Sequence, residues 1–190
     1  MKPTLWMMGV VAVLAAGVVH AKECKSVTFA EQAQSEGHTL TLNGLGLHQA
    51  TMLKIDAYVA ALYVTKVSSD PTAILDANSP YRLTLQLLRD VGAKDISKGW
   101  DEGFERNAKE QLPALKDRIA TLNGWMADMK TGEQLEFSFT PGAGLQVSVK
   151  GAVRGTIPGD DFGKAFLAIS LGARAKDQGL KAGLLGGACG

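Results

Sequence analysis

Few side chains in this sequence could do chemistry, and those that could are far apart. The histidines are His20, His38 and His48, and the two cysteines, Cys24 and Cys189, lie near opposite ends of the chain. No group of cysteine, histidine or carboxylate residues has the spacing of metal ligands, so we expect no metal site. The absence of a Gly-x-Ser-x-Gly sequence and the terminal positions of the cysteines also argue against a nucleophilic triad.

The most informative stretch runs from Leu42 to Val64 and begins with Gly44-x-Gly46. A third glycine and a following helix are missing, so this is not a dinucleotide-binding loop, and no cofactor is expected. We interpret the two glycines as turn residues. His48 follows them on a strand, where it is either a partly exposed strand histidine or a cationic or hydrogen-bonding group at the mouth of a pocket.

Four other side chains could serve a site or simply fill the core. Tyr58 and Tyr63 belong to an apolar strand, where tyrosines are usually core residues with satisfied hydroxyl groups. Trp100 lies on the apolar stripe of a predicted helix, which again favours the core. Asn107 lies at the edge of the same stripe, where it is either solvated or a deliberate polar contact.

The strands that position these residues come early in the chain. Thr39–Leu42 and Leu45–Leu53 are predicted strands separated by a turn at Asn43-Gly44. Ala57–Val64 is apolar on both faces, which favours a strand, with a helix as the alternative. One face carries Tyr58, Ala60, Leu62 and Val64, and the other Val59, Ala61 and Tyr63. Such a strand must be covered on both faces, so we place it centrally in a sheet.

Helical and strand patterns alternate in the middle of the chain. Asp70-Pro71, as N-cap and first helical residue, predicts a short helix. Tyr81–Leu87 alternates and predicts a strand with one wet face. A longer helix is predicted from Gly92 to about Gln111, and Leu112-Pro113 begins another with a continuous apolar stripe.

The C-terminal third predicts an antiparallel meander followed by a last helix. The alternating segments are Leu135–Thr140, Leu145–Lys150 and Val153–Ile157. The helix takes Asp160 or Asp161 as its N-cap and ends at Gly172, and the glycine-rich tail after Gly186 is predicted to be loose. With a short edge strand at Val27–Ala30, the pattern predicts an α+β domain whose large antiparallel sheet carries two or three helices on one face.

The N-terminus has the features of an export signal. A positive Met1-Lys2, an apolar Leu5–Val19 and the small residues around Ala21 predict a signal peptide, residues 1–21, that is cleaved after Ala21. An uncleaved membrane anchor is the alternative. We expect residues 22–190 to form a single domain, with a core of about 27–186, that is exported to the periplasm and has no stable membrane span.

Charge and cysteine content limit the partners and leave one question open. The chain has 20 basic and 19 acidic residues without basic runs, which argues against nucleic acid or anionic membrane surfaces as main partners. Export would make a disulfide between Cys24 and Cys189 chemically possible. The alternative is two cysteines in frayed tails, unpaired or linked between molecules.

Several segments resemble the chalcone isomerase-like family, in particular its small bacterial exported members. The resemblance covers roughly Val27 to Gly186, and it depends on the order and spacing of the segments more than on any one of them. They are Leu42–His48, Lys54-Ile55, Tyr58–Val64, Leu88–Val91, Gly99–Gly103 with Asn107, Gly151–Ile157 with Asp161-Phe162, Leu171-Gly172 and Leu184–Gly186.

The resemblance implies an open-faced β-sandwich, in which a large antiparallel sheet packs against a layer of helices with a ligand cleft between them. Plant members of the family cyclise chalcones to flavanones. They stabilise the developing anion with an arginine, while a threonine and a tyrosine order a water. Related non-catalytic members are thought to bind fatty acids, whose carboxylate pairs with the arginine.

Carried over onto this sequence, the family's site is largely replaced. His48 takes the place of the arginine, Tyr58 that of the strand threonine and Trp100 that of the helix tyrosine, while Asn107 alone matches. A guanidinium is always charged, whereas histidine is mostly neutral at pH 7. We therefore expect no catalytic residue and no efficient chalcone isomerase activity.

The sequence thus favours a non-catalytic protein that binds a small hydrophobic ligand, with a fatty acid as one candidate. His48 and Tyr58 would hydrogen-bond the polar head of the ligand, and Trp100 and Asn107 would line the cleft.

Two alternatives remain. One is an isomerase or lyase on another substrate, with the histidine as acid, and the other is an envelope protein–protein interaction module whose cleft is filled by its own side chains. The favoured interpretation assumes a cleft that has lost its permanent positive charge, and an arginine from elsewhere beside His48, such as Arg89 or Arg154, would contradict it.

Overall fold

The computed structural model describes residues 20–50 and 54–189. Nearly all of the predicted signal peptide lies outside the described residues, as does the end of the strand predicted at Leu45–Leu53. The described elements are, in chain order, β1 (Ala21–Cys24), β2 (Val27–Ala30), β3 (Gln32–Ser35), β4 (His38–Ala50), β5 (Ile55–Val64), α1 (Pro71–Asp76), β6 (Tyr81–Leu87), α2 (Ala93–Asn107), the 3-10 helix η1 (Lys109–Gln111), α3 (Leu112–Gly124), β7 (Gln134–Thr140), β8 (Gly144–Val149), β9 (Ala152–Ile157), α4 (Asp160–Leu171) and α5 (Gln178–Leu184). None of the described helices is both long enough and apolar enough to cross a lipid bilayer.

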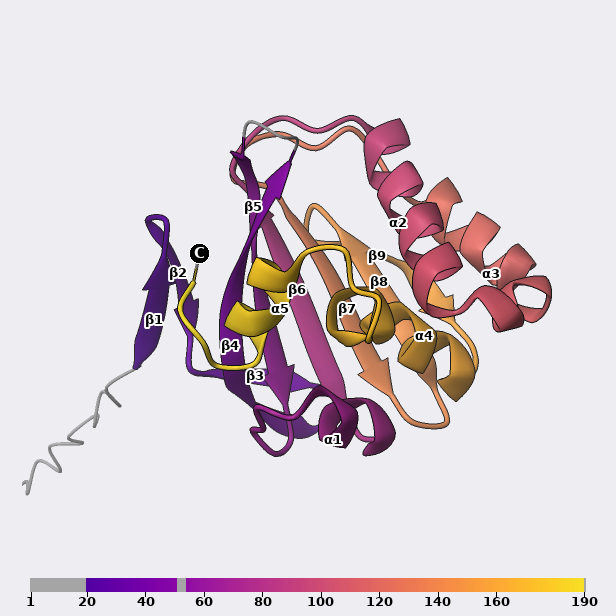
Figure 1. Cartoon of the computed structure of the whole chain (residues 1–190), viewed down its shortest axis with the longest axis horizontal. Coiled ribbons are helices and arrows are strands. Elements are labelled where there is room, and N and C mark those ends of the chain that lie inside the picture. The colour runs from indigo at the N-terminus through magenta and orange to yellow at the C-terminus, as the bar shows by residue number, and fades with distance from the viewer. Residues whose placement is uncertain (1–19, 51–53, 190) are drawn as a thin grey trace, which may run out of the picture.

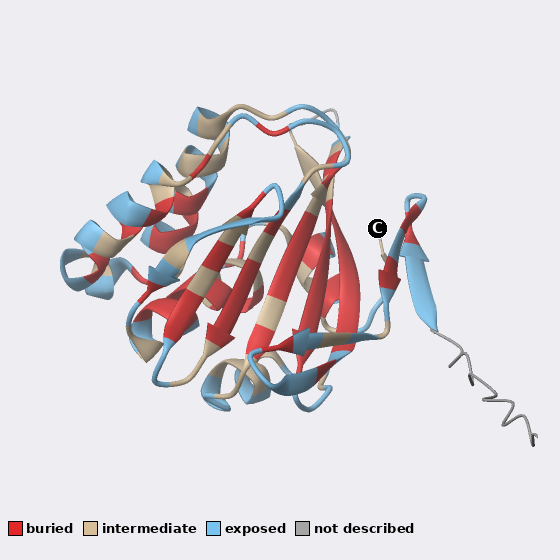
Figure 2. Cartoon of the chain, turned by 180° about the vertical axis from the view of Figure 1, so that it is seen from behind, coloured by how far each residue is buried: buried red, intermediate tan, exposed pale blue. Residues whose placement is uncertain are grey.

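The centre of the fold is a seven-stranded sheet in which the strands follow one another in chain order from β3 to β9. Every neighbouring pair is antiparallel, while β1 and β2 form a separate two-stranded sheet beside it (Figure 1). The helices lie on one side of the large sheet, and no helix covers the strands when the molecule is seen from behind (Figure 2). This arrangement confirms the expected α+β fold with an open-faced sheet.

Strand β5 is buried on both faces, as its sequence predicted. Ala60, Leu62 and Val64 belong to the large core beneath the helices, and Tyr58 packs against that core. The intervening residues belong to a second core with the β1–β2 hairpin and the C-terminal segment, and they are Val59, Ala61 and Tyr63. Alternation along one strand therefore connects two hydrophobic cores on opposite sides of the sheet.

The turn predicted at Asn43-Gly44 is wrong, because β4 runs through these residues as one continuous strand. A register shift between Leu42 and Gly44 marks a β-bulge there. The Asn43 amide group is buried and donates to the carbonyl oxygens of Ser68 (3.0 Å) and Leu184 (2.7 Å). The Asn-Gly pair therefore forms a bulge within β4 and anchors the end of α5, instead of closing a hairpin.

Gly44 and Gly46 let helix α5 lie directly on β4. A Cβ at Gly44 would collide with the backbone of Gly183, and one at Gly46 would collide with the carbonyl oxygen of Leu180. Neither glycine has a positive φ, so close approach of the two backbones, not turn geometry, explains them.

The helix predictions are mostly confirmed, with two corrections. Asp70 caps α1 and accepts from the backbone N–H of Thr72 at 2.9 Å, and Gly92 precedes α2 as expected. The N-cap of α4 is Gly159, because Asp160 and Asp161 already lie in its first turn. Helix α5 was not predicted at all, since its short glycine-containing sequence shows no clear apolar period.

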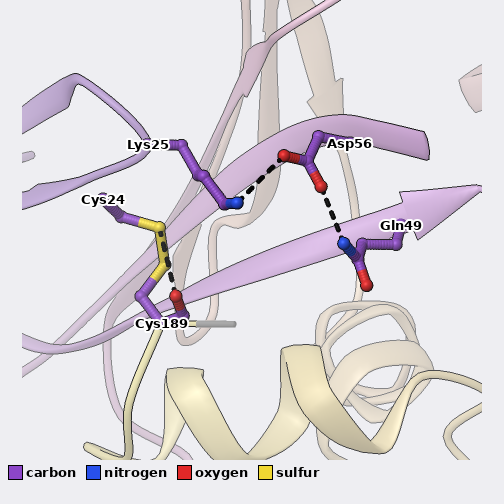
Figure 3. The surroundings of a disulfide bond; sticks show 5 residues. All are labelled: Cys24, Lys25, Gln49, Asp56 and Cys189. Carbon is purple, nitrogen blue, oxygen red and sulfur yellow. Dashed lines mark hydrogen bonds and ion pairs between the residues drawn. A yellow bond between two sulfur atoms is a disulfide. The ribbon is translucent and has the colours of Figure 1, made fainter. Parts of the chain in front are cut away.

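The question of the two cysteines is answered by a disulfide bond between Cys24 and Cys189, whose Cα atoms are 6.0 Å apart (Figure 3). The bond joins the β1–β2 hairpin to the C-terminal segment, so the prediction of a loose tail is wrong. Close to it, Lys25 pairs with Asp56 at 3.2 Å, and Gln49 donates to the same carboxylate at 2.8 Å. These contacts fix the hairpin against β4 and β5.

Candidate functional site

A cleft of about 490 Å³ lies between the helical side of the sheet and helices α2, α4 and α5. Its floor is apolar and comes from β5, β6 and β7, with Ala60, Leu83, Leu85, Leu87 and Leu135. Its walls include Ile96 and Trp100 of α2, Ile169 of α4 and Leu180 of α5. The aromatic side chains of the core leave this space open, so the structure does not have a cleft plugged by its own rings.

All four predicted site residues line this one cleft. His48 comes from β4 and Tyr58 from β5, while Trp100 and Asn107 come from α2. His48 and Tyr58 are cross-strand partners, and their rings stack with centroids 4.7 Å apart and planes at 27°. Their placement is what the sequence predicted, and contact with a ligand stays a prediction.

His48 is held by an aspartate that the sequence gave no reason to choose. Its Nδ1 lies 2.8 Å from Oδ2 of Asp177, and both side chains are about a quarter exposed, at 29% and 24%. Asp177 is also the N-cap of α5 and accepts from the backbone N–H of Leu180 at 2.8 Å. We call His48, Tyr58 and Asp177 the polar end of the cleft. Sequence reasoning missed Asp177 because it did not predict helix α5, and without that helix an N-cap at Asp177 cannot be recognised.

The electrostatics of the polar end follow from burial and hydrogen bonding. Burial alone would raise the pKa of Asp177, but hydrogen bonds from His48 and from the backbone N–H of Leu180 outweigh it and lower the pKa below its ordinary value. Burial and the nearby Asp177 carboxylate raise the pKa of Tyr58. Near neutral pH, Asp177 is therefore ionised and the Tyr58 hydroxyl group keeps its proton.

Trp100 and Asn107 form a wall of the cleft and are already engaged within the fold. Trp100 is buried, packs edge-on against Phe137 at 5.5 Å and directs its indole N–H toward the sulfur of Met126 at 3.4 Å. The Asn107 side chain donates to the carbonyl oxygen of Gly103 at 3.1 Å and accepts from the backbone N–H of Arg174 at 3.2 Å. Both residues shape the cleft, with their polar groups turned to protein partners.

The expectation of a cleft without permanent positive charge is wrong. Arg89, just after β6, and Arg106, near the end of α2, both line the cleft, whereas Arg154 is not among its lining residues. Arg89 is exposed and forms no ion pair with any residue that the structure describes. Arg89 and Arg106 therefore bring permanent positive charge into the lining of the cleft, while position 48 itself carries an imidazole.

Gly99 is a further residue that sequence reasoning did not single out as part of the site. It lies in the middle of α2 and lines the cleft, and a Cβ added to it would meet no atom within 4 Å. Four residues later, a Cβ at Gly103 would collide with Ile169. Close packing against Ile169 therefore explains Gly103, whereas no neighbouring atom occupies the space beside Gly99.

Within residues 20–50 and 54–189, no group of three or more histidine, cysteine, aspartate or glutamate residues is placed to hold a metal ion. The side-chain groups of the polar end are one imidazole, one carboxylate and one phenol. The imidazole and the carboxylate are hydrogen-bonded to each other. This arrangement suits hydrogen bonding and proton exchange with a polar group inside an otherwise apolar cleft.

Comparison with known proteins places this fold and cleft in a family. The model of the chalcone isomerase-like family matches residues 21–186, so the chain belongs to that family. Thirty-seven chains of solved structures match. One of them, a fatty-acid binding protein of Arabidopsis thaliana, is 12% identical with a TM-score of 0.66, and the match covers 87% of this chain and 96% of that one. A search of curated proteins finds no match. The expected family and fold are confirmed.

Proposed function

We propose that this protein is an exported, non-catalytic binding protein that holds a small hydrophobic or fatty-acid-like ligand in the cleft between sheet and helices. The observation that carries the proposal is the cleft itself, with about 490 Å³ of space, an apolar floor and polar side chains that include those of the polar end. Ligand pockets in proteins usually have volumes of about 300–1,000 Å³ and few polar groups on apolar walls. An amphiphile with an apolar body and a polar head fits an apolar floor with polar groups beside it.

The structural neighbour supports the same class of ligand. Its title describes a fatty-acid binding protein, and the two chains share their fold over nearly their full length. At 12% identity the shared fold does not transfer the ligand, so the proposal depends on the cleft of this chain.

Filling the cleft should abolish binding, and two glycines provide a matched pair of variants. Gly99 and Gly124 are both helical with no atom within 4 Å of an added Cβ, but only Gly99 lines the cleft. We expect Gly99→Phe to lower the affinity for a fluorescent fatty acid at least tenfold by occupying the mouth of the cleft, and Gly124→Phe to change it little.

The measurement is a fluorescence titration, together with native mass spectrometry of protein purified from its own compartment. Retained fatty acid or another lipid in the wild-type protein supports the proposal. A protein that carries no ligand and also ignores the fluorescent fatty acid contradicts it. Equal binding by the two phenylalanine variants would mean that ligands bind outside this cleft.

The contact between His48 and Asp177 favours one second candidate function, an isomerase or lyase on an unknown substrate. A carboxylate on one ring nitrogen orients a histidine for proton transfer through the other. This function would give a pH–rate profile whose inflection is lost in His48→Ala. We expect no cyclisation of naringenin chalcone well above the spontaneous rate. The reason is that position 48, where the family has its arginine, carries a histidine in this chain.

The proposal includes export to the periplasm and cleavage after Ala21. The disulfide between Cys24 and Cys189 supports an oxidising compartment, since disulfides are rare in the cytosol. N-terminal sequencing of the protein from a periplasmic fraction should begin at Lys22. Recovery of the full-length chain from the cytosolic fraction would contradict this part of the proposal.

A further inference from the structure

The bond between His48 and Asp177 decides which ring nitrogen can respond to a ligand. An ionised aspartate can only accept hydrogen bonds, so the hydrogen of the 2.8 Å contact belongs to Nδ1 of His48. Asp177 is itself fixed by the N–H of Leu180 at the start of α5. Nε2 is therefore the nitrogen that changes state: it accepts a hydrogen bond when the imidazole is neutral and donates one when it is protonated.

Tyr58 supplies a donor whose state does not change. Its ring stacks on the imidazole with centroids 4.7 Å apart, so it lies directly beside His48. Its pKa is raised by burial and by Asp177, and none of the described residues accepts a hydrogen bond from its hydroxyl group. The polar end thus offers one permanent donor and one nitrogen that can gain or lose a proton.

We propose that the polar end recognises a carboxylic acid together with one proton, which is held between a ligand oxygen and Nε2 of His48 while the second oxygen accepts from Tyr58. This inference rests on the proposed function and deepens it. The proton comes from solvent when the ligand binds and returns to solvent when the ligand leaves. Asp177 acts as a positioning residue, because it fixes the tautomer and holds the charge of the imidazolium.

The charge of Asp177 favours the proton. Asp177 is ionised, so a carboxylate entering the polar end beside a neutral imidazole would face a like charge there. Protonation of His48 removes this repulsion. Aspartate, glutamate, lysine and arginine side chains ordinarily keep their charge through neutral pH, whereas histidine changes its charge there. The other charged groups that line the cleft are Arg89 and Asp90 after β6, Asp95, Glu102 and Arg106 on α2, and Lys176 before α5.

The alternative is that Arg89 binds the ligand carboxylate, and this alternative predicts a different dependence of affinity on pH and salt. Its guanidinium is exposed at the cleft and would pair with a carboxylate without any proton. Such a solvent-exposed pair is weakened by salt and insensitive to pH near neutrality. A complex that holds an extra proton instead loses affinity as pH rises, by up to about tenfold in Kd for each pH unit above the range where free histidine is protonated.

The experiment compares dodecanoic acid with dodecanol on the disulfide-intact protein, from pH 6.0 to 8.5 at constant ionic strength. We expect the Kd of the acid to rise at least tenfold over this range and the Kd of the alcohol to stay nearly constant. Calorimetry in buffers of different ionisation enthalpy should show uptake of close to one proton per acid bound at pH 8.

Two variants test the residues. His48→Gln keeps a polar side chain of similar size but cannot take up a proton, so its pH dependence and proton uptake should disappear. Asp177→Asn keeps an N-cap and removes the charge that favours the imidazolium, so the loss of affinity should begin at lower pH. A merely structural role of either residue would weaken both ligands equally and leave the proton uptake unchanged.

The outcomes separate the two proposals. If neither ligand binds at any pH, the proposed function itself is wrong. If both bind with the same flat pH profile and no proton uptake, the binding function stands and this inference is overturned. It is also overturned if Arg89→Gln, rather than His48→Gln, removes the preference for the acid and the remaining affinity depends only on salt.

Discussion

The residues at the polar end show how one aspartate can serve structure and site together. Asp177 caps α5 through the N–H of Leu180 and holds the imidazole of His48 from the neighbouring strand. Each bond lowers the pKa of the carboxyl group against the opposing effect of burial. The same charge therefore stabilises the helix and sets the tautomer of the histidine in the cleft.

At this scale we predict that Asp177→Ala lowers the free energy of unfolding at pH 7 by about 1–2 kcal/mol, the usual value of a lost N-cap, while Asp177→Asn costs less. Because the folded pKa is lowered, the stabilisation by the carboxylate is complete above its unfolded pKa of about 3.9 and is lost as pH falls through the folded value. Urea unfolding at pH 7 and pH 3 measures both effects. An Asp177→Ala protein with the wild-type midpoint at pH 7 would contradict the prediction.

At the scale of elements, the contact between β4 and α5 depends on missing side chains. Gly44 and Gly46 on the strand and Gly183 on the helix allow the backbones to touch, and the Asn43 amide bonds the last turn of α5. This close approach brings the N-terminus of a seven-residue helix over the cleft. A helix so short is marginal alone, so tertiary packing must stabilise it.

We predict that Gly46→Ala lowers the free energy of unfolding by about 1–3 kcal/mol, because its Cβ would collide with the backbone of Leu180 in α5. Gly99→Ala is the matched control, since its Cβ meets open space inside α2, and it should be neutral or stabilising by up to about 1 kcal/mol. Thermal and urea unfolding of both variants give the comparison. Equal stability of the two would mean that α5 does not press on the strand.

The molecule as a whole is a sheet with two unequal cores, closed by a covalent link between its ends. The large core lies under the helices and contains the cleft, while the small core lies under the β1–β2 hairpin. The disulfide spans 165 residues and connects the hairpin to the segment that follows α5. In the chain-entropy model, closing a loop of this length stabilises the fold by about 5 kcal/mol.

Removing the disulfide with Cys24→Ser and Cys189→Ser together should lower the free energy of unfolding by about 2–5 kcal/mol. The main effect should be on the unfolded chain, so the fatty acid affinity of the folded double variant at low temperature should change little. Thermal unfolding with and without reductant checks this. Reductant should destabilise the wild-type protein and leave the double variant unchanged, and equal sensitivity of both would contradict the assignment.

Regular patterns in the sequence determined most of the fold. The two apolar faces of β5 predicted burial on both sides, and the Asp70-Pro71 pair predicted the start of α1. Local signals of this kind work because burial and capping act over a few neighbouring residues. The resemblance to the family predicted that His48 and Tyr58 would share one cleft, and they do.

Only the tertiary structure decided the rest, because the deciding contacts join residues distant in sequence. Asn43-Gly44 looks like a turn locally and is instead a bulge, because helix α5 from the far end of the chain packs on it. Asp177 and Arg89 enter the site only once α5 and the end of β6 are placed beside β4 and β5. The pairing of Cys24 with Cys189 likewise depends on their Cα atoms coming within 6.0 Å, a distance set by folding and not by sequence.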